Sequence, residues 1–261
     1  MPSAIFDLTG RVAIITGSSR GIGFASALRM AELGAKVVVS GRKIEACEEA
    51  AHAINREAGA RGGEAIPAAA NIGRREDLEA LVSTAIAKWG KVDIVMANAA
   101  IHPWIGSIVD LPEQTFQKFI QANVQSGITL AQLTLPGMAG RGYGRFLIVA
   151  SIVGLLADAE TGTYGLTKAA DMQMARNIAL EFGAKGVTAN CIAPGTIRTE
   201  MARSQWDNEQ TAAAYTRRNP TGRFGEADEV AGLAVMLASR AGGYINGQTI
   251  VVDGGHSISF R

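Results

Sequence analysis

The chain has 261 residues, and 25 Lys and Arg against 24 Asp and Glu give a formal net charge of +1. This balance argues against nucleic acid as a main partner, because nucleic-acid binding needs a concentrated basic surface. Hydrophobic residues make up 48% of the chain, which is enough for a large core and excludes a disordered protein.

The two cysteines, Cys47 and Cys191, provide neither a disulfide framework nor a metal-ligand spacing, which fits a reducing compartment. Met1 to Gly10 lacks the charged and apolar segments of a signal peptide. The longest apolar stretch, 146–157, is shorter than the ~20 residues that a spanning helix needs. We therefore expect a soluble, cytoplasmic protein with no membrane partner.

Short β-branched runs alternate with longer helical patterns along the whole chain. The expected strands are 12–15, 37–39, 64–69, 92–96, 146–149, 187–192 and 249–252. The helical patterns between them fall at about 25–33, 45–57, 77–89, 112–138 and 163–182. Continuously apolar strands are typical of a parallel sheet covered on both faces, and the alternation predicts right-handed βαβ units. The sequence thus predicts one α/β domain over 1–261, a doubly wound parallel sheet flanked by helices, with 194–225 as a long irregular substrate-binding loop.

A glycine-rich segment, 16–23, follows the first expected strand and opens the first helix. Its spacing is Gly-x3-Gly-x-Gly, carried by Gly17, Gly21 and Gly23. Glycines permit a tight turn and a close backbone approach to a phosphate, and the helix N-terminus supplies free N–H groups. The segment predicts a dinucleotide-binding site.

Two other interpretations of this segment are weaker. A P-loop needs Lys and then Ser or Thr after the last glycine, but Phe24 and Ala25 stand there. Residues 17–21 also match the G-x-S-x-G elbow of hydrolases, whose oxyanion loop precedes the elbow. Little chain precedes Gly17 to form that loop, and His256 is the only histidine placed to complete a triad.

The end of the second strand indicates which dinucleotide is preferred. An NAD site places Asp or Glu there to bind the ribose 2′-hydroxyl, whereas this chain has Gly41 and Arg42. Arg42 and Arg20 are suited to bind a 2′-phosphate through charge-assisted hydrogen bonds. The sequence therefore favours NADP(H) over NAD(H), unless both arginines are simply solvated.

Tyr164 and Lys168 lie one helical turn apart, which places a phenol and an ammonium on the same helix face. An adjacent cation favours the phenolate, which suits the phenol to proton exchange at neutral pH. Ser151 follows the strand at 146–149, and Asn98 and Pro194-Gly195 follow two other strands. Ligands of open α/β sheets bind at the carboxyl ends of strands, so these residues are expected to meet in one crevice.

These motifs resemble those of the short-chain dehydrogenase/reductase family over essentially the whole chain. The matching pieces are 16–23, Asn98-Ala99-Ala100, Asn123, Ser151, Tyr164-x3-Lys168, 194–199 and the ending 252–255. The resemblance implies a Rossmann-type sheet and nicotinamide-dependent redox chemistry at an alcohol or carbonyl. It also implies a homotetramer whose interfaces use the helices at Pro112 and Thr163.

The resemblance also implies roles for individual residues. Tyr164 would be the general acid, Lys168 would hold the nicotinamide ribose, and Ser151 would polarise the substrate oxygen. Asn123 would anchor a water that relays protons toward Lys168. The implied cofactor-binding set is Gly17, Ser19, Arg20, Gly21, Ile22, Gly23, Arg42, Asn71, Ile72, Asn98, Ala99, Tyr164, Lys168, Pro194, Gly195, Ile197 and Thr199.

Two departures from the family pattern concern the cofactor-binding set. Ala97 and Ala100 replace an Asn and a Gly, and neither lost residue performs chemistry. Asn71 replaces the usual Asp, but its amide oxygen can still accept a hydrogen bond from adenine.

The predicted function is NADP(H)-dependent interconversion of a ketone or aldehyde and an alcohol. The alternatives are an NAD-dependent sugar, polyol or alcohol dehydrogenase of the same family, and a non-catalytic dinucleotide-binding protein. The expected substrate-binding residues are Ser151, Val153, Tyr164, Trp104, Met201 and Trp206. No metal is expected, because the three histidines form no cluster with cysteines or carboxylates.

Overall fold

The computed structural model describes residues 4–259, so the predicted single domain over 1–261 and the Met1–Gly10 segment each extend beyond the described part. Within that part the chain forms a seven-stranded sheet. Its strands are β1 (Val12–Ile15), β2 (Lys36–Gly41), β3 (Glu64–Ala69), β4 (Ile94–Ala97), β5 (Gly144–Val149), β6 (Val187–Pro194) and β7 (Thr249–Val252). The helices are α1 (Gly21–Glu32), α2 (Ile44–Ala58), α3 (Arg75–Trp89), α4 (Glu113–Phe119), α5 (Ser126–Gly140), α6 (Gly162–Phe182), α7 (Arg203–Trp206), α8 (Glu209–Arg218) and α9 (Ala227–Ala238).

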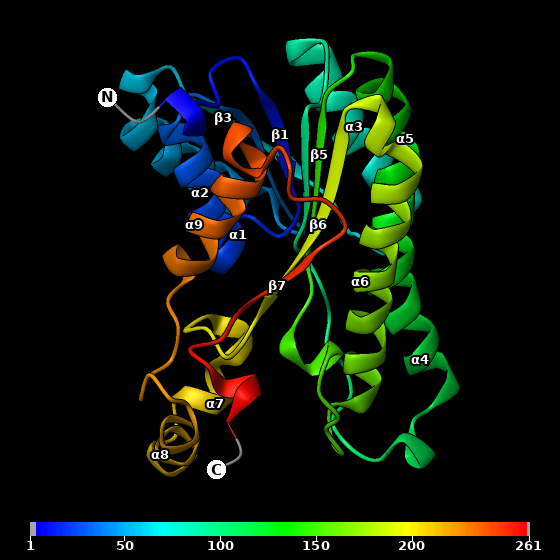
Figure 1. Cartoon of the computed structure of the whole chain (residues 1–261), viewed down its shortest axis with the longest axis vertical. Coiled ribbons are helices and arrows are strands. Elements are labelled where there is room, and N and C mark those ends of the chain that lie inside the picture. Colours follow the sequence, from blue (N-terminus) through cyan, green and yellow to red (C-terminus); the bar gives the residue numbers. More distant parts are fainter. Residues whose placement is uncertain (1–3, 260–261) are drawn as a thin grey trace.

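Every strand pair in the sheet is parallel, and the strand order is β3-β2-β1-β4-β5-β6-β7. Helices α1, α2 and α9 cover one face, and α3, α4, α5 and α6 lie on the other (Figure 1). The chain builds outward from β1 to β3 and then returns to place β4 on the other side of β1. The predicted α/β doubly wound, Rossmann-type sheet is confirmed, and its order reverses between β1 and β4, where such sheets bind ligands.

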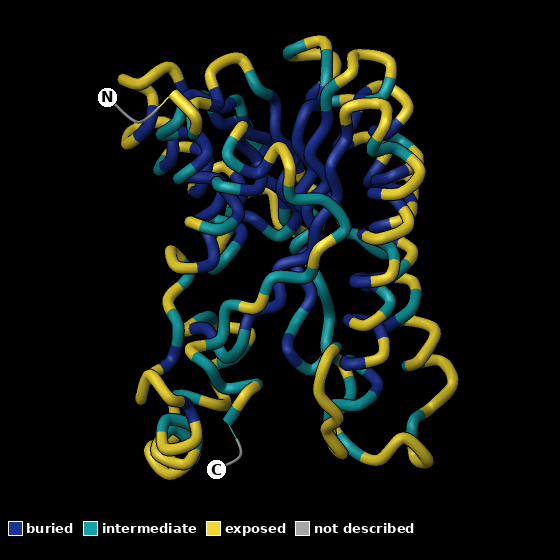
Figure 2. Tube along the Cα trace, viewed as in Figure 1, coloured by how far each residue is buried: buried dark blue, intermediate teal, exposed yellow. Residues whose placement is uncertain are grey.

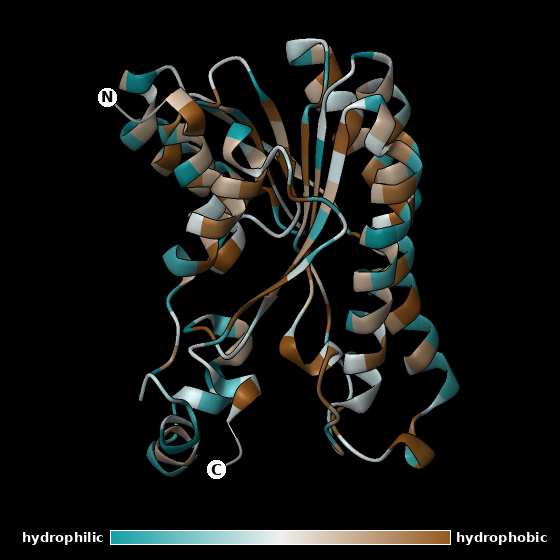
Figure 3. Ribbon diagram, viewed as in Figure 1, coloured by the Kyte–Doolittle hydropathy of each residue, from teal (hydrophilic) through white to brown (hydrophobic). Residues whose placement is uncertain are grey.

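Both faces of the central strands β1, β4 and β5 are buried, whereas β7 at the edge of the sheet is partly exposed. Ala13 and Ile15 of β1 pack into the core under α1, α2 and α9, while Val12 and Ile14 pack into the core under α3, α5 and α6. Burial is therefore concentrated in the strands and the inner helix faces (Figure 2), and the strands are mostly hydrophobic (Figure 3). Because neither face of β1 meets water, its four residues are all apolar, whereas β6 also buries the polar side chains of Thr188 and Asn190.

The predicted long helical region at about 112–138 is confirmed, but it is not a uniform α-helix. That segment is divided into α4, a π-helical stretch over Ile120–Gln125, and α5. A π-helical stretch widens the helix locally and shifts the register of the side chains that follow, an event often found at functional sites. Here it contains Asn123, one of the predicted site residues.

The structure corrects the prediction of an irregular loop over 194–225. This segment contains α7 and α8, and the side chain of Asn208 caps α8 by accepting a hydrogen bond from the backbone of Thr211 at 3.0 Å. Both helices lie beyond the carboxyl end of β6 (Figure 1). Among residues 4–259, no helix combines the length and the apolar character needed to cross a membrane.

Candidate active site

The loop after β1 is held from the side of β4 by Asn98. The Asn98 side-chain amide donates to the carbonyl oxygens of Thr16, at 2.8 Å, and Gly17, at 3.2 Å. In return, the Thr16 hydroxyl accepts hydrogen bonds from the backbone N–H groups of Asn98 and Ala99, both at 3.1 Å. Gly17 and Gly21 have φ values of +66° and +59°, a conformation that side chains disfavour. These hydrogen bonds fix the loop to the end of β4.

A second contact ties the same loop to β2. The Ser18 hydroxyl donates to the Ile15 carbonyl at 2.6 Å and accepts from the backbone of Ser40 at 2.9 Å. Ser18 is fully buried, so this hydroxyl stabilises the loop and is not a nucleophile. The hydrolase interpretation requires the next residue of this loop, Ser19, to act as the nucleophile. Hydrogen bonds instead fix the loop to the ends of β2 and β4, which argues against the hydrolase interpretation.

The loop leads into the N-terminus of α1, which has no side-chain cap. Its first backbone N–H groups are thus free to bind an anion. Gly23 makes the close approach possible, since a Cβ there would lie 2.4 Å from the Gly17 carbonyl oxygen. This arrangement fits a phosphate-binding loop.

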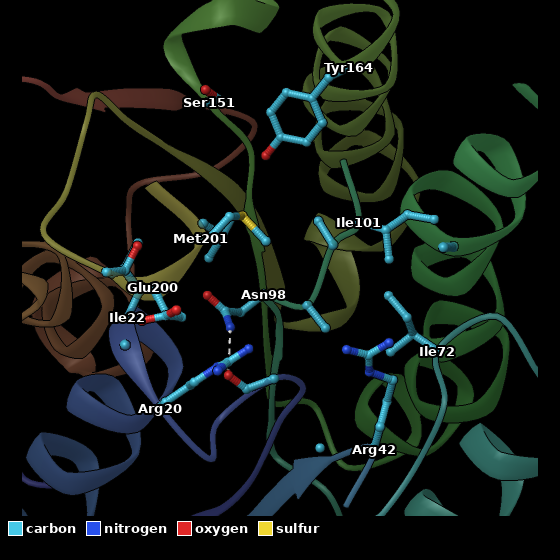
Figure 4. A pocket seen from close by; sticks show the side chains of 18 of the residues that line it. Arg20, Ile22, Arg42, Ile72, Asn98, Ile101, Ser151, Tyr164, Glu200 and Met201 are labelled. Atoms are coloured by element: carbon cyan, nitrogen blue, oxygen red, sulfur yellow. Dashed lines mark hydrogen bonds between the residues drawn. The ribbon is translucent and has the colours of Figure 1, made fainter. Parts of the chain in front are cut away.

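A cavity of about 690 Å³ runs along the carboxyl ends of the strands (Figure 4). All predicted cofactor-binding residues except Gly23 are among the described residues that line it. The lining is strongly cationic although the whole chain is nearly neutral. Its basic residues are Arg20, Arg42, Arg74, Lys118 and Lys168, and Glu200 is the one acidic residue among the described residues that line it. A cavity of this charge is suited to an anionic ligand.

Arg20 and Arg42 lie at the end of the cavity opposite Tyr164 (Figure 4). Both are exposed, and within residues 4–259 neither side chain forms a hydrogen bond or an ion pair. Their guanidinium groups are therefore available to a ligand. No acidic side chain in the lining follows β2, where a carboxylate would repel a 2′-phosphate.

At the other end, Ser151 follows β5 while Tyr164 and Lys168 lie on α6 (Figure 4). Two glycines let these segments pack closely. A Cβ at Gly165 would lie 2.5 Å from the Val153 carbonyl oxygen, and one at Gly154 would lie 2.8 Å from the backbone of Lys168. The fold thus brings the predicted hydroxyl, phenol and ammonium groups to one end of the cavity.

The Lys168 ammonium lies 5.5 Å from the centre of the Tyr164 ring. It donates hydrogen bonds to the Val149 carbonyl at 2.9 Å and to the Asp171 carboxylate at 2.8 Å. Burial acts to lower the pKa of Lys168, but Asp171, Tyr164 and Cys191 together outweigh this effect and hold the pKa above its ordinary value. Lys168 therefore stays protonated beside Tyr164.

His102, which follows β4, stacks on the ring of Tyr164. Its ring centre is 4.6 Å from that of Tyr164, with 29° between the planes. Burial lowers the pKa of His102, an effect that Asp158 opposes. The imidazole is thus held neutral against the phenol ring and limits the ring's movement.

Comparison with known proteins agrees with this geometry. A family model described as Enoyl-(Acyl carrier protein) reductase matches residues 17–257. Dehydrogenase/reductase SDR family member 4 from Bos taurus is 38% identical over 248 residues, which cover 95% of this chain and 88% of the relative. The chain belongs to the short-chain dehydrogenase/reductase family.

Solved structures show the same relationship. A putative gluconate dehydrogenase from Agrobacterium tumefaciens has 30% identity and a TM-score of 0.92, with 98% of this chain and 99% of that one covered. A gluconate 5-dehydrogenase from Burkholderia cenocepacia, in complex with NADP and tartrate, has 31% identity and a TM-score of 0.89, with 98% of each chain covered. The chain is thus an oxidoreductase of a family that binds a nicotinamide dinucleotide, and the uncapped helix, the glycine loop and the cationic lining fit that cofactor.

Asn123, which the family resemblance singles out, lies in the π-helical stretch and is buried. Its side chain accepts a hydrogen bond from the backbone N–H of Ile101 at 2.8 Å and donates to the Ile101 carbonyl at 2.9 Å. It also donates to the Thr167 hydroxyl at 3.2 Å. Asn123 therefore fixes the segment after β4 to α6, and its role with a proton-relaying water remains a prediction.

The predicted substrate-binding residues divide into two groups. Ser151, Tyr164 and Met201 line the cavity. Val153, Trp104 and Trp206 are not among the described residues that line it. Trp206 instead donates its indole N–H to the Thr199 carbonyl at 3.0 Å, which anchors α7 to the segment after β6.

Sequence reasoning did not find several residues that line the cavity in this short-chain dehydrogenase. Arg74, Lys118, Gln121 and Glu200 lie on segments that follow β3, β4 and β6. No motif marks them. Their one available signal is position, since each follows a strand whose carboxyl end faces the crevice.

Proposed function

We propose that this short-chain dehydrogenase uses NADP(H) to interconvert a ketone or aldehyde and the corresponding alcohol. The proposal rests on one observation, the different side chains found at the two ends of one cavity. Arg20 and Arg42, which have no side-chain partner among residues 4–259, lie at one end, and Ser151 and Tyr164 lie at the other (Figure 4). The Lys168 ammonium is 5.5 Å from the centre of the Tyr164 ring. A dinucleotide that spans the cavity would bring its nicotinamide to the hydroxyl groups.

The bound nicotinamide dinucleotide supplies the hydride for reduction and accepts it in oxidation. In this proposal the Ser151 hydroxyl donates a hydrogen bond to the substrate oxygen and orients it. Tyr164 protonates that oxygen during reduction, or removes the proton during oxidation. The Lys168 ammonium favours the phenolate form of Tyr164 and binds the ribose hydroxyls with its remaining N–H group. Pro194, Gly195, Ile197 and Thr199 also line the cavity, and Ile197 and Thr199 are assigned to the carboxamide.

The reaction is tested by following NADPH and NADH oxidation at 340 nm over a panel of ketones, aldehydes, oxidised sugars and keto acids. Keto acids belong in the panel because two structural neighbours are described as gluconate dehydrogenases. The variant Tyr164→Phe is expected to lower kcat by about 10²–10⁴-fold, the contribution of general acid–base catalysis, while NADPH still binds. Unchanged turnover would contradict the assigned mechanism.

The preference for NADP(H) is tested at Arg42. Wild type is expected to bind NADPH at least about tenfold more tightly than NADH, and Arg42→Asp should remove this preference. Arg56→Asp is the matched control, because Arg56 is exposed on α2 and is not among the described residues that line the cavity. Equal affinities for both dinucleotides in wild type would favour the alternative of an NAD-using sugar, polyol or alcohol dehydrogenase.

We also propose a homotetramer and a cytoplasmic location. The tetramer is supported by apolar side chains that α4, α5 and α6 leave exposed, namely Phe116, Ile128, Leu166 and Leu180. Leu180 is 89% exposed. Light scattering after size exclusion tests the assembly, and a monomer at micromolar concentration would contradict it. Fractionation of cells that express the chain tests the location, since one human relative is described as mitochondrial.

A further inference from the structure

Asp171 is a buried carboxylate that the proposed reaction does not use. It lies one helical turn after Lys168 on α6, and its Oδ2 is 2.8 Å from the Lys168 Nζ. The side chains of the two residues are 2% and 3% exposed, respectively. Within the described residues, the Asp171 carboxylate pairs with no other side chain.

The contacts of the Lys168 ammonium leave one N–H group for a ligand. An ammonium has three donors, of which one is taken by Asp171 and one by the Val149 carbonyl at the end of β5. Lys168 also lines the cavity. The two protein contacts hold the long side chain in one orientation, so its remaining N–H group is directed by the fold.

Few charged groups act on this ammonium. On α6 they are Asp171 and Tyr164, and on β6 the facing group is Cys191. Burial raises the pKa of Cys191, so this thiol stays neutral at neutral and mildly alkaline pH. β5 contributes only the backbone carbonyl of Val149. Among the groups of the described residues that act on this ammonium, Asp171 is thus the one carboxylate, and it is in direct contact with the buried cation.

We propose that Asp171 is a positioning residue, whose carboxylate keeps the Lys168 ammonium charged and directed at the dinucleotide-binding cavity. A buried ammonium without a counter-charge gives up its proton readily, because a low-dielectric interior disfavours the charged form. The inference rests on the proposed function in one respect only, the assignment of Lys168 to the cofactor.

The test replaces Asp171 with Asn, which has the same shape and no charge. In Asp171→Asn the buried lysine is expected to be protonated at about pH 6 and neutral at about pH 9.5. The dissociation constant of NADPH, measured by fluorescence titration, should then stay within about twofold of wild type at pH 6. At pH 9.5 it should rise about five- to tenfold, because a neutral amine forms weaker hydrogen bonds than an ammonium.

The loss of stability in Asp171→Asn should depend on pH in the opposite way to the loss of NADPH affinity. In Asp171→Asn the folded protein holds the Lys168 proton less tightly than the unfolded chain, whose lysine keeps its ordinary pKa of 10.5. The loss of thermal midpoint relative to wild type should therefore be larger at pH 6 than at pH 9.5. Opposite trends in binding and stability result from a single proton on Lys168, whereas a purely structural role gives losses that do not depend on pH.

Two further variants make the test complete. Asp228→Asn is the matched control, since Asp228 also pairs with a basic residue on a helix, Arg29 at 2.9 Å, but in an exposed position. Its small loss should be the same at both pH values. In Lys168→Met/Asp171→Asn no charge remains buried, so the pH dependence of the stability loss should disappear.

Equal losses for Asp171→Asn at both pH values would overturn the inference, as would a pH-dependent loss that persists in the double variant. None of these measurements requires turnover. A wild-type protein that reduces no carbonyl compound would refute the proposed function and leave the binding and stability results to decide the role of Asp171.

Discussion

The substitution Gly23→Ala tests whether the close contact between α1 and the loop after β1 shapes the phosphate-binding site. An added Cβ would lie 2.4 Å from the Gly17 carbonyl oxygen, 2.7 Å from the Asn98 side-chain nitrogen and 2.8 Å from the Ser18 Cα. Ordinary contacts begin near 3.4 Å, so the Gly17 carbonyl must move by roughly 1 Å. It cannot move freely, because Asn98 holds it by a hydrogen bond.

The expected magnitude follows from two opposing effects. Overpacking of this kind lowers the free energy of unfolding by about 1–3 kcal/mol, and the higher helix propensity of alanine offsets about 1 kcal/mol of that loss. The free energy of unfolding should therefore fall by up to about 2 kcal/mol. The displaced loop should also weaken NADPH binding by at least about tenfold, which is about 1.4 kcal/mol.

Gly232→Ala is the matched control. Gly232 lies inside α9, is exposed, and has no atom within 4 Å of the position of an added Cβ. The same substitution there should stabilise the protein by about 0.5–1 kcal/mol and leave NADPH binding unchanged. Denaturant unfolding and fluorescence titration measure both quantities. Wild-type NADPH affinity in Gly23→Ala would refute the argument that this contact shapes the loop.

Three other predictions concern the site. Asn98→Ala removes two hydrogen bonds to the loop, and it should cost about 1–3 kcal/mol of stability and weaken NADPH binding, as unfolding and titration would show. Burial holds the pKa of His102 below the value of 6.5 in an unfolded chain, so the stability that neutral His102 contributes is lost as pH falls below that value. Between pH 7.5 and pH 5.5, the free energy of unfolding should therefore fall less in His102→Asn than in wild type, as unfolding curves at the two pH values would show. An equal fall in both proteins would contradict this prediction. Turnover should survive dialysis against a chelator, because residues 4–259 contain no group of three His, Cys, Asp or Glu side chains able to hold a metal ion.

The sequence alone was sufficient to predict the sheet and the main features of the candidate site. Strands buried on both faces are typically apolar throughout, so the short apolar runs at 12–15 and 146–149 indicate strands of a covered parallel sheet. The glycine spacing and the Tyr164–Lys168 pair lie within single local segments, where distance along the chain determines distance in space. Parallel topology then places the ends of β1, β4, β5 and β6 together.

Tertiary structure decided which side chains from distant segments meet. The stacking of His102 on Tyr164 and the exclusion of Trp104 and Trp206 from the cavity lining depend on how loops pack after the sheet has formed. The segment 194–225 was expected to be irregular because its helices are short and polar. Contacts such as the hydrogen bond from the Thr196 backbone to the Tyr215 hydroxyl, at 3.1 Å, hold them in place.

Asp171 shows the same limit most clearly. In the sequence it is one more polar residue on a helical pattern, and helix periodicity indicates only that it lies near Lys168. Its function depends on burial, which comes from the packing of α6 against β5 and β6 and turns an ordinary pair of charges into a buried ion pair. Burial is set by many segments at once, and for that reason only the folded chain reveals the role of this carboxylate.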